Sequence, residues 1–164
     1  MATLELRRAL ARPDAETLVR QVDAYADYFA KGEGEWPDEH ADDFSEILHA
    51  AHDAEKALAY VVIAASRTDD ADFLRFLGCG PLENLLFHAS PELMRRIIAE
   101  ARRSARFRWL LSCPYKAAID PAAWEQIKPF RQTGEHEEPS LDTLPPRNVA
   151  SSGRALMSAI RKRT

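Results

Sequence analysis

The chain has 164 residues, of which 46% are hydrophobic and 29% are charged. This length favours one domain with a sizeable core, and the composition is typical of a soluble globular protein. No apolar run reaches the roughly 18 residues that a membrane span needs. The first ten residues lack the apolar stretch of a signal peptide. We therefore expect a cytoplasmic protein that does not bind membranes.

The net charge of −4 conceals an asymmetry along the chain. Residues 1–60 hold 14 acids and 6 bases, whereas residues 61–164 hold 12 acids and 16 bases. Such a charge distribution can orient a partner or support self-association. Alternatively, the acidic first part lies against the basic second part. The two cysteines, Cys79 and Cys113, lack a metal-binding spacing and fit a reduced compartment.

Helical periodicity accounts for the first half of the chain. A weak helix over Thr3–Arg12 ends at Pro13-Asp14, which also caps a second helix with a clear apolar stripe. A third helix follows Trp36-Pro37. The fourth, Ala54 to Arg67, is the most apolar and is expected to be surrounded by neighbours. Its β-branched run, Val61 to Ile63, could indicate a strand, but alanines flank it and helices precede and follow.

The centre of the chain predicts two adjacent amphipathic helices. Asp69-Asp70 caps a short helix that Gly78 closes, and Gly80-Pro81 then opens a new one. Ser90-Pro91 starts the next, with Ser as N-cap and Pro at the first helical position. The apolar stripes over 82–89 and 93–101 are expected to pack on each other and on the rest of the core.

Short helices are also predicted at 106–111 and after Asp120-Pro121. Residues 131–151 lose the pattern and form a Pro-rich linker, and residues 152–164 form a basic amphipathic tail helix. Strand alternation is lacking. The sequence therefore predicts an all-α fold: a single compact domain of short antiparallel helices over 1–130, either a bundle or stacked helix pairs, with a C-terminal extension.

Three blocks of sequence carry a resemblance to a known family. They are G-P-L-E-N-L-L at 80–86, I-A-E-A-R-R at 98–103 and R-F-R-W-L-L at 106–111. The chain resembles a bacterial family catalogued only as a domain of unknown function, whose members share G-P-L-E-[DN]-L-L, E-A-R-R and R-F-R-W-L-L. The resemblance spans about residues 36–130 and implies a small helical protein. It implies no established activity, so no catalytic residues are transferred.

An acidic face on the third predicted helix is the first candidate site. Asp42, Glu46, His49 and Asp53 fall within a narrow band at helical spacing, which suits contact with a basic partner. Glu46-x-x-His49 also matches half of a di-iron motif, but the chain lacks the second half, so a solvated polar face is favoured and no metal is expected.

Other motifs do not predict a cofactor or a catalytic group. Gly78-x-Gly80 begins like a dinucleotide-binding fingerprint, but no strand precedes it and Glu83 replaces the third glycine. A turn between helices is expected to explain both glycines. We expect no cofactor and no catalytic residue.

A basic band is the second candidate site. Phe107 and Trp109 are interleaved with it, so the band could contact phosphates and stack on bases. Glu92 and Glu100 could instead neutralise it through pairs within the helix, and the acidic balance of the chain disfavours nucleic acid. The band comprises Arg95, Arg96, Arg102, Arg103 and Arg106, with Arg108 beside it.

We expect a non-enzymatic protein-interaction module whose acidic surface docks to a basic partner, as an antidote protein caps a toxin, or which self-associates. The first alternative is a nucleic-acid-associated regulator that uses the arginine band and the 154–163 tail. The second, less favoured, is an enzyme or metal protein centred on Glu46, His49 and Asp53.

Overall fold

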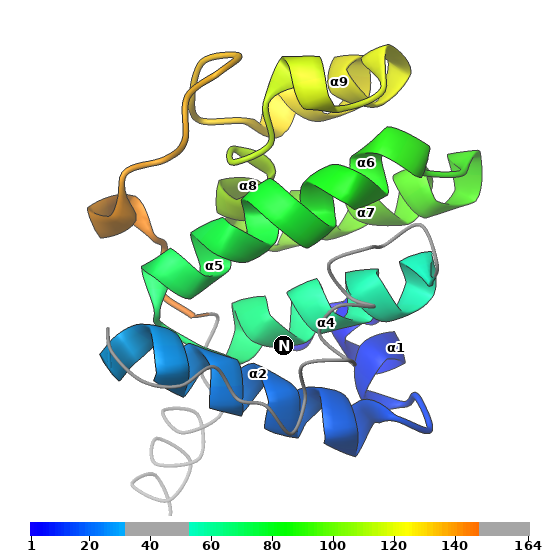
Figure 1. The fold of residues 1–164 in the computed structure, drawn as a ribbon. Coiled ribbons are helices and arrows are strands. Elements are labelled where there is room, and N and C mark those ends of the chain that lie inside the picture. Colours follow the sequence, from blue (N-terminus) through cyan, green and yellow to red (C-terminus); the bar gives the residue numbers. More distant parts are fainter. Residues whose placement is uncertain (32–52, 148–164) are drawn as a thin grey trace, which may run out of the picture.

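The structure is a computed structural model that describes residues 1–31 and 53–147. Over these residues the chain is helical and contains no strand, which confirms the predicted all-α class. The α-helices are α1 (Leu4–Leu10), α2 (Ala15–Lys31), α4 (Ala54–Arg67), α5 (Ala71–Leu77), α6 (Glu83–His88), α7 (Pro91–Arg103), α8 (Ala105–Leu111) and α9 (Pro121–Ile127) (Figure 1). A π-helical segment, η2 (Gly78–Leu82), and the 3-10 turns η3 (Lys116–Ala118), η4 (Lys128–Phe130) and η5 (Leu141–Thr143) complete them.

Two predicted helices lie outside the described residues. The helix expected after Trp36-Pro37 falls in 32–52, and the basic tail falls in 152–164. Within the described ranges, none of the helices combines the length and the apolarity that crossing a membrane would require.

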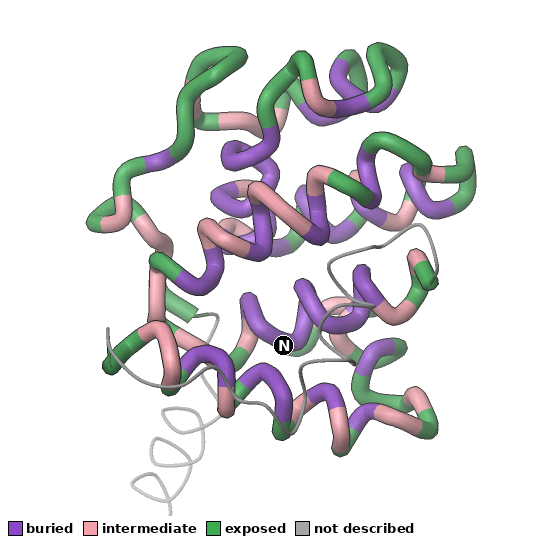
Figure 2. Tube along the Cα trace, in the orientation of Figure 1, coloured by how far each residue is buried: buried purple, intermediate pink, exposed green. Residues whose placement is uncertain are grey.

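Helix α4 is the centre of the packing. Its residues from Ala57 to Ala65 are buried on every side, as Figure 2 shows. The helices α1 and α2 pack against one side of it, and α5, η2, α6 and α8 pack against others (Figure 1). This enclosure favours burial of the β-branched Val61 to Ile63 within a helix, because packing overrides their weak preference for strands.

Most helix starts are fixed by local capping. The side chains of Asp70, Ser90 and Asp120 each accept a hydrogen bond from the first turn of the helix that follows, as predicted. Each such cap is worth about 1 kcal/mol. Further N-caps are Thr3 on α1, Asp53 on α4 and Ser104 on α8.

The prediction of a turn between helices at Gly78 to Pro81 is wrong. The chain continues from α5 through η2 into α6 as one helical run, with Pro81 inside it. A proline within an α-helix lacks the N–H that would bond four residues back and clashes with that carbonyl. The wider π-type turn of η2 relieves this conflict.

Close packing explains the glycine at 78. A Cβ placed there would lie 2.6 Å from Cβ of Cys113 and 3.0 Å from the carbonyl oxygen of Leu110. The absent side chain therefore lets η2 approach the end of α8.

Both apolar stripes predicted in the centre of the chain contribute to the core. Leu85 and Leu86 of α6 are buried, as are Met94 and Ile97 of α7. Their main contacts are with other helices, however: α6 packs on η2, α4 and α9, whereas α7 packs on α8, α9 and α1. The two helices shape the interior, but mainly through their neighbours.

Residues 131–147, which we name the C-terminal strap, run along the domain from α9 past α8 and α5 (Figure 1). Nε1 of Trp109 donates to Oγ1 of Thr143 at 3.0 Å. Arg147 reaches Asp69 at 2.9 Å. Apart from η5, the strap has no regular helix over 131–147, and it is packed against the helices of the domain.

Candidate functional site: an arginine groove

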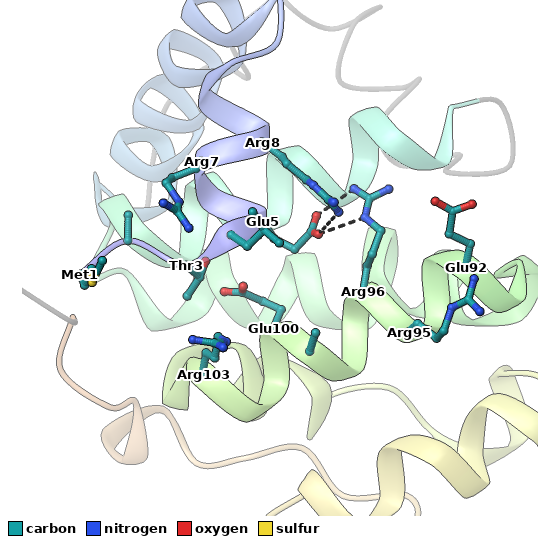
Figure 3. A pocket seen from close by; sticks show the side chains of 13 residues that line it. Met1, Thr3, Glu5, Arg7, Arg8, Glu92, Arg95, Arg96, Glu100 and Arg103 are labelled. Carbon is teal, nitrogen blue, oxygen red and sulfur yellow. Dashed lines mark hydrogen bonds and ion pairs between the residues drawn. The ribbon is translucent and has the colours of Figure 1, made fainter.

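An open groove of about 710 Å³ lies between the start of the chain with α1 and the outer face of α7 (Figure 3). Helix α7 turns Leu93, Met94 and Ile97 toward the core. Three of its arginines, Arg95, Arg96 and Arg103, line the groove on the opposite face. The lining contains five arginines and three glutamates, namely Arg7, Arg8, Arg95, Arg96, Arg103, Glu5, Glu92 and Glu100. We refer to it as the arginine groove.

A buried carboxylate in the wall of the groove joins its two sides. Glu5 on α1 is only 5% exposed, and Arg96 on α7 donates to it twice, from Nε at 3.0 Å and from Nη2 at 2.8 Å. Arg8 adds a third bond at 2.8 Å, and Arg96 also reaches Glu55 on α4 at 2.6 Å. The bonds to Glu5 join α1 to α7, as Figure 3 shows, and the pair with Glu55 joins α7 to α4.

The electrostatics of Glu5 follow from that network. Burial opposes ionisation of Glu5, but the hydrogen bonds and charge of Arg96, together with Arg8, outweigh it and hold the pKa of Glu5 below its usual range. The hydrogen bond from Arg96 to Glu5 in turn raises the pKa of the guanidinium. Both groups are therefore charged at neutral pH.

Glu100 behaves in the opposite way. Glu100 is also 5% exposed. Burial is the largest cause that raises its pKa, and the nearby charge of Glu5 adds to it. The hydrogen bond from Thr3 and the charge of Arg103 lower the pKa but do not outweigh these causes. Oγ1 of Thr3 also accepts from the backbone N–H of Leu6 at 3.2 Å. Thr3 therefore connects the N-cap of α1 to Glu100, whose charged form is disfavoured by burial.

Three arginines of the groove, Arg7, Arg95 and Arg103, are exposed and have no ion pair within residues 1–31 and 53–147. We name them the open arginines. Arg95 and Arg103 stand about 12 Å apart along α7, as eight residues of helix require. A guanidinium offers a planar fork of N–H donors that matches a carboxylate or a phosphate. The groove can therefore receive an anionic ligand at several points.

The structure divides the predicted basic band. Arg95, Arg96 and Arg103 gather at the groove, whereas Arg102 is exposed but does not line it. Arg106 is 5% exposed and lies elsewhere. It donates to the carbonyl oxygens of Thr68 and Pro145 and pairs with Asp69, so its guanidinium is occupied.

The aromatic residues of the band are not available for stacking. Phe107 and Trp109 both have 0% exposure, because α8 is packed against α7 and covered by the strap. The aromatic residues that alternate with arginines in the sequence therefore belong to the core and not to the basic surface. Arg108 donates to the carbonyl of Ala101 at 2.8 Å.

The predicted acidic face lies almost wholly outside the described residues. Asp42, Glu46 and His49 fall in 32–52, and only Asp53 can be placed. Its carboxylate accepts from the backbone N–H of Lys56 at 2.9 Å, which makes it the N-cap of α4. Across 1–31 and 53–147, no three His, Cys, Asp or Glu side chains are grouped in a way that could hold a metal ion.

Several groove residues were not singled out as site residues from the sequence, namely Glu5, Arg7, Arg8, Glu92 and Glu100. The sequence places Glu92 and Arg96 one turn apart on the same helix, but Arg96 bonds instead to Glu5 and Glu55, which are 91 and 41 residues away in sequence. Spacing along one helix gives no indication of such partners.

Comparison with known proteins places the chain in a family without giving it an activity. No curated protein and no solved structure matches the chain. The sequence model of a family described as "Family of unknown function (DUF6869)" matches residues 30–134. Both cysteines and all of α7 lie within this range, whereas α1 precedes it. The resemblance to an uncharacterised family is thus confirmed: the chain belongs to this family of unknown function.

Proposed function

We propose that the protein is a non-enzymatic interaction module whose arginine groove binds an acidic segment of a partner protein. The observation that carries the proposal is the set of open arginines. Arg7, Arg95 and Arg103 line one groove without an ion pair in the described ranges, while Arg96 beside them is held by two glutamates. An acidic peptide would supply the missing carboxylates.

The shape and charge of the groove support a peptide over a nucleic acid. Its glutamates, including the exposed Glu92, would repel a continuous phosphate backbone but can lie between separate carboxylates of a ligand. The aromatics that could have stacked on bases are buried, and the chain is acidic overall, with a net charge of −4. Short acidic segments therefore suit the groove better.

Binding of a basic partner through the acidic face remains a separate prediction. Residues 32–52 contain seven acids and neither Lys nor Arg, which suits an antidote-like contact with a basic protein. A bacterial, cytoplasmic setting is part of the same expectation. The two modes predict ligands of opposite charge, so a single set of probes distinguishes them.

The test uses fluorescence anisotropy with the full chain and three labelled probes. The probes are a short peptide of alternating Glu and Ser, its Lys and Ser counterpart, and a single-stranded oligonucleotide of similar length. We expect the acidic peptide to bind, and binding to weaken as salt is raised. Tighter binding of the oligonucleotide would support the regulator instead, and binding of only the basic peptide would support the acidic face.

A variant and a charge-matched control assign the binding to the groove. R7Q/R95Q/R103Q should weaken acidic-peptide binding roughly tenfold, because three exposed contacts of about 0.5 kcal/mol each sum to about the 1.4 kcal/mol of a tenfold change. The control R20Q/R102Q/K128Q removes the same charge from exposed positions outside the groove. Equal weakening in both would show that net charge, not the groove, attracts the peptide.

A further inference from the structure

Two thiols from distant parts of the sequence meet on the side of the domain where η2 contacts the end of α8. Sγ of Cys79, in η2, lies 3.8 Å from the carbonyl oxygen of Cys113, in the turn after α8. The two thiols lie close enough for Cys79 to raise the pKa of Cys113. Both cysteines are free. Thirty-four residues separate them in sequence, so the fold brings them together.

The packing around the pair leaves little room for the thiols to separate. Cys113 lies against the bare backbone of Gly78, where a Cβ would be 2.7 Å from its Sγ. Sγ of Cys113 is further held near the carbonyl oxygen of Trp109 at 3.7 Å. Because Gly78 has no side chain, Cys113 can lie close to the backbone next to Cys79.

The two thiols differ in access. Cys79 is half-buried, whereas Cys113 is fully buried. The adjacent thiol of Cys79, and then burial, raise the pKa of Cys113. Arg131 donates to the carbonyl oxygens of Leu111 and Pro114, on either side of Cys113, so a positive charge stands beside the pair. An external reagent can therefore reach Cys79 before Cys113. The charge of Arg131 lies near Cys113 and favours its thiolate when that group reacts second.

We propose that Cys79 and Cys113 form a reversible dithiol–disulfide site that exchanges with a small disulfide such as glutathione disulfide. The Cys79 thiolate attacks one sulfur of the reagent, forms a mixed disulfide and releases one glutathione. The Cys113 thiolate then attacks the Cys79 sulfur and releases the second glutathione. The protein loses two electrons and two protons, which the two released glutathione thiols carry.

The disulfide would join the helical run α5–η2–α6 to the turn that follows α8. That turn is already tied to α6, because the backbone N–H of Tyr115 donates to Oε2 of Glu83 at 3.1 Å. A covalent link here closes a loop that contains α6, α7 and α8 and so restricts the unfolded chain. The site is separate from the arginine groove and does not depend on the proposed function.

The test treats the reduced full-length protein with glutathione disulfide at neutral pH and measures its intact mass under native conditions. We expect the mass to fall by two hydrogen atoms, with a Cys79–Cys113 peptide recovered after non-reducing digestion. The melting temperature should rise by roughly 5–10 °C and return on reduction. A folded protein that stays reduced, keeps a bound glutathione or forms only cross-linked dimers would overturn the proposal.

Single variants check the order of attack. C113S should retain one glutathione on Cys79, because the second thiol is missing. C79S should react much more slowly, because Cys113 is buried. Equal reactivity of the two variants would contradict the assigned order, and the measurement on the natural sequence decides the disulfide itself even if a variant does not fold.

Discussion

The open arginines of the groove and the arginines beneath the strap are used in different ways. On the strap side, Arg106 donates to the carbonyl oxygens of two distant segments, at Thr68 and Pro145. Arg131 donates to the carbonyl oxygens of Leu111 and Pro114 and of its near neighbour Gly134. On the groove side, Arg95 and Arg103 are exposed and unpaired within the described ranges. The comparison shows that an arginine is available to a partner only where the fold has not already supplied its acceptors. Three substitutions, two of them paired with a control variant, test how the fold uses charged side chains in these two regions. Their expected effects range from strongly destabilising to slightly stabilising.

The largest effect is expected on the strap side, for Arg106→Met. The variant keeps the length of the side chain but leaves the carbonyls of Thr68 and Pro145 without their donor and Asp69 without its ion pair. Because Arg106 itself is buried, unpairing two carbonyl oxygens and losing the ion pair together cost about 3–5 kcal/mol. Urea denaturation followed by circular dichroism should show this as a lower free energy of unfolding.

Arg95→Met is the matched control on the groove side. Arg95 is exposed and unpaired within the described ranges, so the change should alter stability by no more than about 0.5 kcal/mol. Similar losses for the two variants would remove the distinction between occupied and available arginines.

A smaller loss is expected where the groove is fixed to the core, for Glu5→Gln. The variant loses the charge that holds Arg96 and Arg8, but Arg96 keeps Glu55 and is partly exposed, so the cost should be about 2–3 kcal/mol. The pKa of Glu5 in the fold is below its ordinary value of 4.5. Its stabilising contribution is therefore complete above that value and is lost as the pH falls through the lower, folded pKa.

The pH profile provides the check for Glu5. The difference in free energy of unfolding between the natural protein and Glu5→Gln should be constant near neutral pH and shrink in acid. A difference that stays the same down to strongly acidic pH would show that shape, not charge, accounts for the loss.

The parts of the fold that could be predicted are those specified locally. Helix α4 begins and ends at the predicted residues, Ala54 and Arg67, because its cap and its apolar run are adjacent in sequence. The starts at Ser90 and Asp120 follow from a capping side chain and a proline. Such signals require no knowledge of the tertiary neighbours.

What could not be predicted depends on contacts between distant segments. The sequence around Gly78 and Pro81 predicts a turn, but the chain continues as one helical run in which a π-type segment accommodates Pro81. The glycine at 78 is explained by the close approach of Cys113, 35 residues later in the chain. The groove escaped prediction because Glu5 and Arg96 meet across 91 residues. Burial of Trp109 beneath the strap removed the aromatic part of the basic band for the same reason.

The smallest effect is expected for Glu100→Gln, and its sign is opposite. Glu100 is buried with a raised pKa, so the fold binds its proton more tightly than the unfolded chain does, and stability falls as the pH rises from 4.5 through the folded pKa. Glutamine removes the buried charge while its carbonyl oxygen can still accept from Thr3. We expect a gain of under about 1 kcal/mol at neutral pH that disappears in acid, where the natural carboxyl group is protonated in both states. Glu92→Gln, on the same helix but exposed, should show no such gain, so equal responses of the two variants would locate the effect in the charge of α7 rather than in burial at Glu100.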